Sequence, residues 1–396
     1  MTGRTEQPRI VILGGGIGGL AAAAFLHRAG LEAQVYEQAP ALTEVGAGLV
    51  VAPNAARLLR RLGVLGAFRE RAVQMDVGWE FRRWEDGTVL SAEDLAERCE
   101  PLYGEQTYVA HRADLLNAIR SAVPEEWIHL NAQCTGVDLD GEHPVLRFAD
   151  GSTVEADVLV GADGIHSQVR GALFGPSPAT FSGMCAFRAL VPIEKAPEFS
   201  RRPAHTLWLG PDHHLVHYPI SGGEYVNLVA VAPAGDYSTE SWTATATVEQ
   251  FLAEFEGWDP RLIELISSAS QIGRWVLLDR APLKQWGKGS VTLLGDAAHP
   301  MFPFFAQGAA QSIEDAEALA SCLAAEPGGP ESALRRYESM RIPRTTKLQE
   351  LSHERATINH LPDGPEQQAR DKRLAESDAL VANGWIYEYD LEGADA

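Results

Sequence analysis

The chain opens on a short apolar run, Arg9–Leu13, which a glycine-rich turn separates from a longer run of small residues. After its arginine the first run is mostly β-branched, which is typical of a parallel strand buried on both faces. The alanine-rich run predicts a helix that ends at Gly30, and Ala33–Glu37 predicts a second strand. The chain therefore begins with a strand, a helix and a strand in close succession.

The pattern changes to alternating apolar and polar positions between residues 179 and 275, where Gly, Pro and Asp separate short runs. Such alternation predicts an antiparallel sheet. Its clearest strands are expected at 181–192, 205–210, 213–220 and 225–233, with helices around Val248–Ser268. The residues after 330 are expected to be mostly helical, with a Pro/Asp/Gly break at 362–365.

Composition narrows the class of protein. The 396 residues carry a formal net charge of −21, and 45% of them are hydrophobic and 22% charged. These fractions are typical of globular proteins and exclude a disordered chain, a fibre and a coiled-coil rod. The acidic balance argues against binding of nucleic acid or of an anionic membrane, because both need clustered Lys and Arg.

Cysteine spacing and the N-terminal apolar run indicate the cellular compartment of the protein. The four cysteines form no CxxC pair, so neither a disulfide framework nor a metal site is expected, and a cytoplasmic location fits. The run Ile10–Leu26 contains five glycines. We therefore interpret it as a strand plus a helix and not as a signal peptide or a membrane span.

The glycine-rich turn has the spacing GxGxxG, formed by Gly14, Gly16 and Gly19. In such turns the first glycine permits a tight bend, the second lets the backbone approach a pyrophosphate, and the third lets the helix pack closely on the strand. Glu37, at the end of the second strand, is placed to bind ribose hydroxyls. The pattern predicts a dinucleotide site, but it does not choose between NAD and FAD.

Two later segments repeat the arrangement of an apolar strand followed by a glycine turn with an acid. The first carries Asp163 and Gly164, and the second carries Gly295 and Asp296. Either segment alone could be an ordinary end of a strand. After the second, a loop from Pro300 leads to Gln307, Gly308 and Ala309 and then to an amphipathic helix. The N-terminus of that helix would favour negative charge ahead of it, although an ordinary helix cap would look the same.

With these three motifs in this order, the chain resembles the single-component FAD-dependent aromatic hydroxylases, which share the para-hydroxybenzoate hydroxylase fold. The resemblance covers residues 9–315 and continues to the C-terminal WIYEYDL. It is greatest to salicylate hydroxylase, 3-hydroxybenzoate 6-hydroxylase and 6-hydroxynicotinate 3-monooxygenase. It implies that Glu37 holds the adenosine ribose, that Asp296 and Arg112 contact the FAD chain, and that Asp163 serves both FAD and NAD(P)H. The residues expected to bind FAD are Gly14, Gly16, Gly19, Glu37, Arg112, Asp163, Asp296, Pro300, Gln307, Gly308 and Ala309.

The expected fold is α/β, with a Rossmann-like FAD-binding domain, an inserted antiparallel-sheet substrate domain and C-terminal helices. The FAD domain is expected to be discontinuous, formed by residues 1–74, 101–178 and 276–320. The substrate domain would comprise residues 75–100 and 179–275, and the helical region residues 321–396. No second GxGxxG motif exists, so NADH or NADPH is expected to bind only transiently. The chain is expected to be a monomer or a homodimer.

The resemblance implies that NAD(P)H reduces the flavin and that O2 then forms a flavin C4a-hydroperoxide, which hydroxylates an electron-rich ring. Such chemistry needs a site from which water is excluded. Val50, Phe302, Phe304 and Phe305 are expected to form an apolar wall of the substrate pocket. Simple core packing would explain the same side chains.

Activation of the ring calls for a group that removes a phenolic proton. In the strand expected at 213–220, His214 and Tyr218 share one face, and by resemblance they are pocket residues. We expect them to be catalytic. His217, on the other face, is a further candidate for the pocket. His299 is expected to be structural or to lie near the flavin.

The substrate is expected to be a small phenolic or amino-aromatic acid, similar to salicylate, with or without oxidative decarboxylation. Val50 and Phe304 stand where the hydroxynicotinate enzyme has polar groups, which favours a benzene ring. Arg188, Arg82 and Arg83 are candidate partners for an anionic substrate, although each could be an ordinary structural arginine. Two alternatives stay open, a hydroxylase or epoxidase of a larger biosynthetic aromatic and a non-catalytic flavoprotein.

Overall fold

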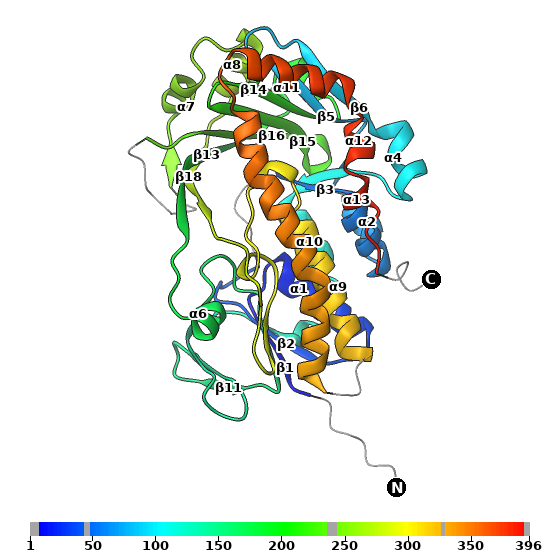
Figure 1. Ribbon diagram of the computed structural model, residues 1–396, viewed down its shortest axis with the longest axis vertical. Coiled ribbons are helices and arrows are strands. Elements are labelled where there is room, and N and C mark those ends of the chain that lie inside the picture. Colours follow the sequence, from blue (N-terminus) through cyan, green and yellow to red (C-terminus); the bar gives the residue numbers. More distant parts are fainter. Residues whose placement is uncertain (1–7, 43–47, 236–243, 326–328, 392–396) are drawn as a thin grey trace.

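A parallel sheet forms the lower half of the molecule (Figure 1). The computed structural model describes residues 8–42, 48–235, 244–325 and 329–391. Five parallel strands lie in the order β19–β12–β1–β2–β8, so segments far apart in the sequence become neighbours. These strands are β1 (Ile10–Leu13), β2 (Ala33–Tyr36), β8 (Ile128–His129), β12 (Val158–Gly161) and β19 (Val291–Leu293).

Helix α1 (Ile17–Arg28) connects β1 to β2 and is buried along most of its length. It packs against α9 (Gly308–Ala325) and α5 (Arg112–Arg120). The small side chains of its Gly-Gly-Leu-Ala-Ala-Ala-Ala run permit this close approach. The other helices of this half are α2 (Pro53–Arg61), α3 (Leu65–Arg69) and α6 (Gln168–Phe174), with a 3-10 turn η1 (Glu125–Trp127).

An eight-stranded, mainly antiparallel sheet forms the upper half, in the order β17–β18–β13–β16–β15–β14–β5–β6. Helices α7 (Val248–Glu254) and α8 (Pro260–Ser267) cover one face of it through a shared apolar core. The strands are β5 (Val77–Arg83), β6 (Val89–Asp94), β13 (Thr180–Pro192), β14 (Ala204–Gly210), β15 (His213–Ile220), β16 (Tyr225–Pro233), β17 (Thr245–Ala246) and β18 (Ile272–Asp279).

Two three-stranded sheets complete the strand structure. One joins the two halves and consists of β3 (Gly48–Val51), β7 (Tyr108–His111) and β4 (Val73–Gln74). The other lies at the base of the molecule and consists of β9 (Cys134–Asp138), β10 (Val145–Phe148) and β11 (Thr153–Glu155). The remaining 3-10 turns are η2 (Glu198–Arg201), η3 (Ser221–Gly223), η4 (Gly295–Ala297) and η5 (Pro303–Phe305).

The long helix α10 (Pro330–Asn359) runs from the parallel sheet up to the antiparallel sheet, as Figure 1 shows in orange. After it come α11 (Pro365–Glu376), α12 (Ala379–Ala382) and α13 (Gly384–Tyr387), and α4 (Leu95–Tyr103) lies beside the last two. Tyr103 Oη donates a hydrogen bond to the carbonyl of Leu380. The C-terminal helices therefore return to the junction of the two halves.

The predicted fold class is confirmed, because a parallel sheet, a large antiparallel sheet and C-terminal helices are all present. Strands from both predicted insertions share the eight-stranded sheet, since β5 lies next to β14. The domain boundaries themselves stay a prediction. Within the described ranges, none of the helices has the length and apolar character needed to cross a membrane. The same residues hold no cluster of three metal-ligating side chains.

Candidate functional site

The three glycine motifs meet at one edge of the parallel sheet. β12 lies between β1 and β19, with Gly161 aligned to Leu13 on one side and to Leu293 on the other. Each motif directly follows one of these strand ends. An ideal Cβ on Gly14 would clash with the carbonyl of Ala162. This edge, beyond the carboxyl ends of the strands, is where open α/β sheets bind ligands.

The glycines of the first turn have the geometry of a phosphate-binding turn. Gly14 adopts a φ of +109°, which L-residues avoid, and a Cβ on Gly19 would clash with the carbonyl of Gly14. A Cβ on Gly16, in contrast, would meet no atom within 4 Å. Gly16 is also the N-cap of α1, and no side chain caps that helix. Unpaired N–H groups therefore face an open space, which fits a pyrophosphate.

Glu37 follows β2 directly and lies beside this turn. Its carboxylate accepts hydrogen bonds from the backbone N–H of Gly15, at 2.7 Å, and of Ala39, at 2.8 Å. Each carboxylate oxygen has a second lone pair, so the group can still accept hydrogen bonds from ribose hydroxyls. The position fits the ribose role that the sequence predicts.

Asp163 has a structural partner that the sequence analysis missed. Its carboxylate accepts hydrogen bonds from Ser167 Oγ, at 2.5 Å, and from the N–H of Gln168, at 2.7 Å, at the start of α6. Burial raises its pKa, while these hydrogen bonds oppose the shift. Asp163 thus fixes α6 at the end of β12, and its predicted contact with FAD or NAD(P)H stays a prediction.

Asp296 is the exposed residue of η4, and no described residue donates a hydrogen bond to its carboxylate. It projects from the same sheet edge as the glycine turn. Arg112 is half-buried and begins α5, directly after β7. An exposed acceptor at this sheet edge fits the ribityl and pyrophosphate parts of FAD, and the predicted contact of Arg112 with the FAD chain stays a prediction.

The loop between Pro300 and α9 is fixed by buried amides. Gln349 donates to the carbonyl of Pro300 at 2.9 Å. Gln307 precedes Gly308 and Ala309, the first residues of α9, and its side-chain oxygen accepts from Asn54 Nδ2 at 2.9 Å. The N-terminus of α9 is therefore held in place on the side where the predicted flavin site lies.

A fully buried ionic network lies behind this helix start. Arg341 of α10 pairs with Glu314 at 2.6 Å and with Asp315 at 2.7 Å, and Arg344 pairs with Glu314 at 2.7 Å. Asp315 also binds His299 Nε2 at 2.5 Å. Burial alone would raise the pKa of Glu314, and the two guanidinium groups outweigh it and lower that pKa. His299 is thus part of a structural network, as expected.

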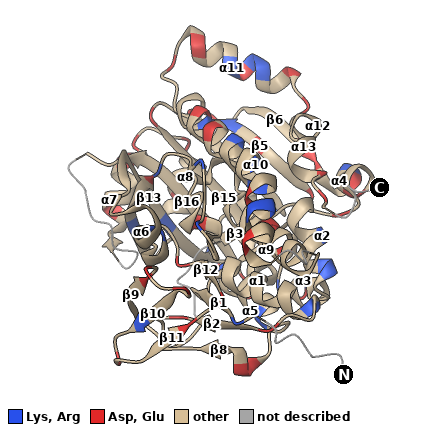
Figure 2. Cartoon of the chain, turned by 60° about the horizontal axis from the view of Figure 1, so that its bottom comes forward, with Lys and Arg blue, Asp and Glu red and all other residues tan. Residues whose placement is uncertain are grey.

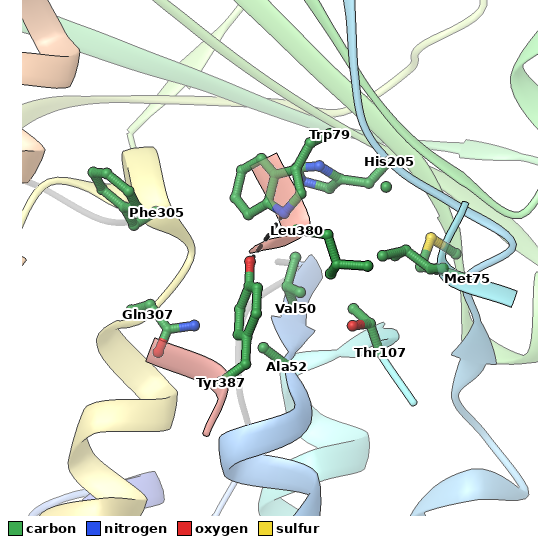
Figure 3. A pocket seen from close by; sticks show the side chains of 12 residues that line it. Val50, Ala52, Met75, Trp79, Thr107, His205, Phe305, Gln307, Leu380 and Tyr387 are labelled. Atoms are coloured by element: carbon green, nitrogen blue, oxygen red, sulfur yellow. Dashed lines mark hydrogen bonds between the residues drawn. The ribbon is translucent and has the colours of Figure 1, made fainter. Parts of the chain in front are cut away.

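A pocket lies where β3, β5, β14 and the C-terminal helices meet (Figure 3). Trp79 Nε1 donates a hydrogen bond to Tyr387 Oη at 3.1 Å, and the His205 ring lies edge-on to Trp79 at 5.2 Å between centroids. Most of the lining is apolar. The lining residues are Val50, Ala52, Met75, Gly78, Trp79, Leu95, Thr107, His205, Phe305, Gln307, Leu380 and Tyr387.

His205 is one of the pocket residues that the sequence analysis missed. It lies on β14, and its ring centroid is 5.2 Å from that of Tyr218. Burial lowers the pKa of His205 to about 4, so its imidazole is neutral near pH 7. Burial also raises the pKa of Tyr218, which keeps its proton. A weak signal was available, because the alternation in β14 places His205, Leu207 and Leu209 on one face.

His214 and Tyr218 do share one face of β15, but they border different clusters. His214 Nδ1 lies 2.6 Å from His360 Nε2, at the end of α10, and its ring contacts Phe304. Phe304 in turn packs against Phe302. Of the predicted apolar wall, Val50 and Phe305 line the pocket, whereas Phe302 and Phe304 belong to the cluster beside His214.

His217 is not among the residues that line this pocket, and its predicted place in the substrate pocket stays a prediction. The residue lies on the opposite face of β15, where its ring packs against Phe199 at 5.4 Å. Neither ring nitrogen has a hydrogen-bond partner among the described residues, and burial lowers its pKa to about 3. The period of two along a strand places His217 and Tyr218 on opposite faces of β15.

The three arginines proposed from the sequence for an anionic substrate are already engaged. Arg82 pairs with Glu80 at 2.8 Å, and Arg83 with Asp363 at 2.7 Å. The guanidinium of Arg188 stacks over the ring of Trp275, with 4.6 Å between its carbon and the centroid. Arg188 is still near Tyr218, since its charge opposes the raised pKa of that phenol.

Comparisons with known proteins identify the class. A family model described as FAD binding domain matches residues 7–352. The chain is 43% identical to 3-amino-4-hydroxybenzoate 2-monooxygenase PtmB3 of Streptomyces platensis, over 97% of each chain. It is 36% identical to 6-hydroxynicotinate 3-monooxygenase of Pseudomonas fluorescens, over 88% of this chain and 91% of that one. A salicylate hydroxylase substrate complex superposes with a TM-score of 0.83 at 27% identity, over 98% and 97% of the two chains.

The protein is therefore an FAD-dependent monooxygenase that takes its electrons from NAD(P)H. The chain belongs to the FAD binding domain family, and the family and cofactor predicted from the sequence are confirmed.

Proposed function

We propose that this monooxygenase hydroxylates a small amino-hydroxybenzoic acid, with 3-amino-4-hydroxybenzoate as the first candidate. The observation that carries the proposal is the mostly apolar pocket, which the neutral imidazole of His205 lines. The protonated phenol of Tyr218 lies beside that imidazole. An aromatic ring suits such walls, and its amino or hydroxyl group suits His205 and Tyr218. The relatives named for aminohydroxybenzoate support this class of substrate.

FAD would be held by the glycine turn, Glu37, Arg112, Asp163, Asp296 and the Pro300–Ala309 segment. When bound, FAD would accept electrons from NAD(P)H and activate O2. The chain's own contribution is to hold the ring of the substrate, to exclude water and to move the phenolic proton. Val50 and Phe305 form the water-excluding wall that such chemistry requires.

Proton movement is assigned to the predicted pair, Tyr218 and His214, together with His205. A neutral His205 can accept a hydrogen bond from the substrate and lies beside Tyr218. His214 and His360 share one hydrogen bond, in which one imidazole donates and the other accepts. Removal of the phenolic proton makes the ring electron-rich and ready for hydroxylation.

The test is NADH and NADPH oxidation by the purified protein with a panel of acids, followed by chromatography of the products. The panel holds 3-amino-4-hydroxybenzoate, salicylate and 6-hydroxynicotinate. We expect the aminohydroxybenzoate to stimulate oxidation most and to give one hydroxylated product per reductant consumed. Stimulation only by salicylate, with loss of CO2, would replace the proposed substrate, and no stimulation by any acid would contradict the proposal.

A further inference from the structure

Arg355 lies on the last turns of α10, where this helix reaches the antiparallel sheet (Figure 1). The carbon of its guanidinium is 4.7 Å from the ring centroid of Phe305 and 6.0 Å from that of Phe81. Phe305 and Tyr387 both line the pocket (Figure 3). The phenol of Tyr387 opposes the effect of burial on the pKa of Arg355. The guanidinium thus borders the pocket wall.

No described carboxylate pairs with this arginine. Other arginines nearby do have acidic partners. Arg82 and Arg83 of the antiparallel sheet and Arg344 of α10 each pair with a carboxylate. Burial lowers the pKa of Arg355, although a guanidinium keeps its proton at any working pH. A desolvated cation without a counter-charge is unfavourable unless a partner arrives.

Tyr387 offers a second donor at the same place. Its oxygen accepts the hydrogen bond from Trp79 Nε1, while its own O–H donates to no described residue. Burial raises the pKa of this phenol, so the proton stays on the oxygen. A guanidinium packed against Phe305 of the pocket wall and a phenolic O–H in the lining are complementary to a carboxylate.

We infer that Arg355 binds the carboxylate of the aromatic substrate, with Tyr387 as its neighbouring donor. The inference rests on the proposed function, and it assigns the specificity for an acid to α10 and not to the arginines that the sequence suggested. The ring would then lie along Phe305, with its other substituents directed toward His205. A neutral ring of the same shape would leave the cation without its partner.

The experiment measures equilibrium binding to the FAD-loaded protein through the change in flavin absorbance, without turnover. The ligands are 3-amino-4-hydroxybenzoate and its carboxamide. In Arg355→Gln the Kd for the acid should rise about 30-fold or more, the size expected when one partner of a buried charge pair is lost. The Kd for the carboxamide should stay within about twofold on the same reasoning. Arg355→Lys keeps the charge, so its Kd for the acid should lie between those of the unchanged protein and of Arg355→Gln.

Arg336→Gln is the matched control, because it removes an exposed positive charge from the same helix. It should bind the acid as the unchanged protein does. Equal weakening of acid and carboxamide in Arg355→Gln would show a structural role and overturn the inference, as would unchanged binding of the acid.

These results separate the inference from the proposed function. If the acid binds through Arg355 but no product forms, the inference stands and the proposed reaction fails. If product forms from acid and carboxamide alike, the reaction stands and the inference fails. If neither the acid nor its carboxamide changes the flavin spectrum, and the acid gives no product, both fail.

Discussion

The three glycines of the first turn differ in what a methyl group would meet. At Gly14 and Gly19 a Cβ would clash with backbone carbonyls, so these positions need glycine for the fold itself. At Gly16 the φ is −73° and the space in front is open, so the fold tolerates a side chain there. Only a bound pyrophosphate would require glycine at this position.

Gly16→Ala should therefore leave the apoprotein folded and weaken FAD binding about tenfold, or roughly 1.4 kcal/mol. The flavin-to-protein ratio and the Kd for FAD measure the effect. Gly66→Ala is the control, because a Cβ there also meets no atom within 4 Å but lies on α3. Full flavin affinity in Gly16→Ala would show that the pyrophosphate does not approach this glycine.

His217 gives a prediction about acid stability. Its folded pKa of about 3 lies below the ordinary value of 6.5, so the unfolded chain takes up a proton first as pH falls. Stability is therefore lost between about pH 6.5 and pH 3, at about 1.4 kcal/mol per pH unit for one group. His217→Leu should reduce the fall in the free energy of unfolding between pH 7 and pH 4.5 by about 2 kcal/mol. Urea titrations at both pH values measure it, and an equal fall in both proteins would contradict the burial of a neutral imidazole.

At the scale of elements, α12 and α13 form one wall of the pocket through Leu380 and Tyr387. Arg57 of α2 holds this wall, since its guanidinium donates to the carbonyls of Tyr389 and Tyr103 at 2.8 Å and of Tyr387 at 3.3 Å. Arg57 thus ties the wall to α2 in the lower half of the molecule.

Arg57→Met should loosen residues 384–389 while FAD stays bound. Loss of hydrogen bonds to a charged donor costs about 1.5–3 kcal/mol, so amide exchange in this segment should accelerate about tenfold or more. More hydrogen peroxide should form per NADH, because water then reaches the site. Arg60→Met on the same helix is the control, as Arg60 pairs with Glu105 and not with the C-terminal segment. Unchanged exchange in Arg57→Met would mean that other contacts hold the wall.

Strand patterns predicted the elements well but not their surroundings. The alternation along 213–220 correctly separated His214 and Tyr218 from His217, yet it could not tell what each face would meet. The amphipathic pattern of α9 gave no sign that Glu314 and Asp315 would be fully buried. Their burial depends on Arg341, a residue that α10 brings to them from elsewhere in the sequence.

At the scale of the molecule, the meeting of the three glycine motifs at one edge of the parallel sheet could be predicted, because each motif follows a strand. Parallel strands bring Gly14, Asp163 and Asp296 to one edge whatever the residues between them. The pocket could not be predicted in this way. Trp79 and His205 belong to strands without a motif, and Tyr387 belongs to the WIYEYDL segment, whose place in the fold the sequence did not indicate. Only the docking of the C-terminal helices on the antiparallel sheet brings the three together.

Acidic residues outnumber basic ones, and the two kinds are mixed along the chain. The net charge is −21, and Figure 2 shows acidic and basic residues interspersed along elements such as α11. Within the described residues, many arginines pair with acids, including those of the buried network between α9 and α10. The inferred attraction for an anion is therefore local to the pocket and its Arg355.

The central claim is that the protein inserts oxygen into the ring of an aminohydroxybenzoate. Its most direct test is the reaction of the FAD-loaded protein with NADH and 3-amino-4-hydroxybenzoate under ¹⁸O2, followed by mass spectrometry of the product. An aromatic monooxygenase inserts one atom from O2, so the product should carry one ¹⁸O in a new ring hydroxyl. NADH consumption that yields only hydrogen peroxide, or a hydroxyl that derives from water, would contradict the account.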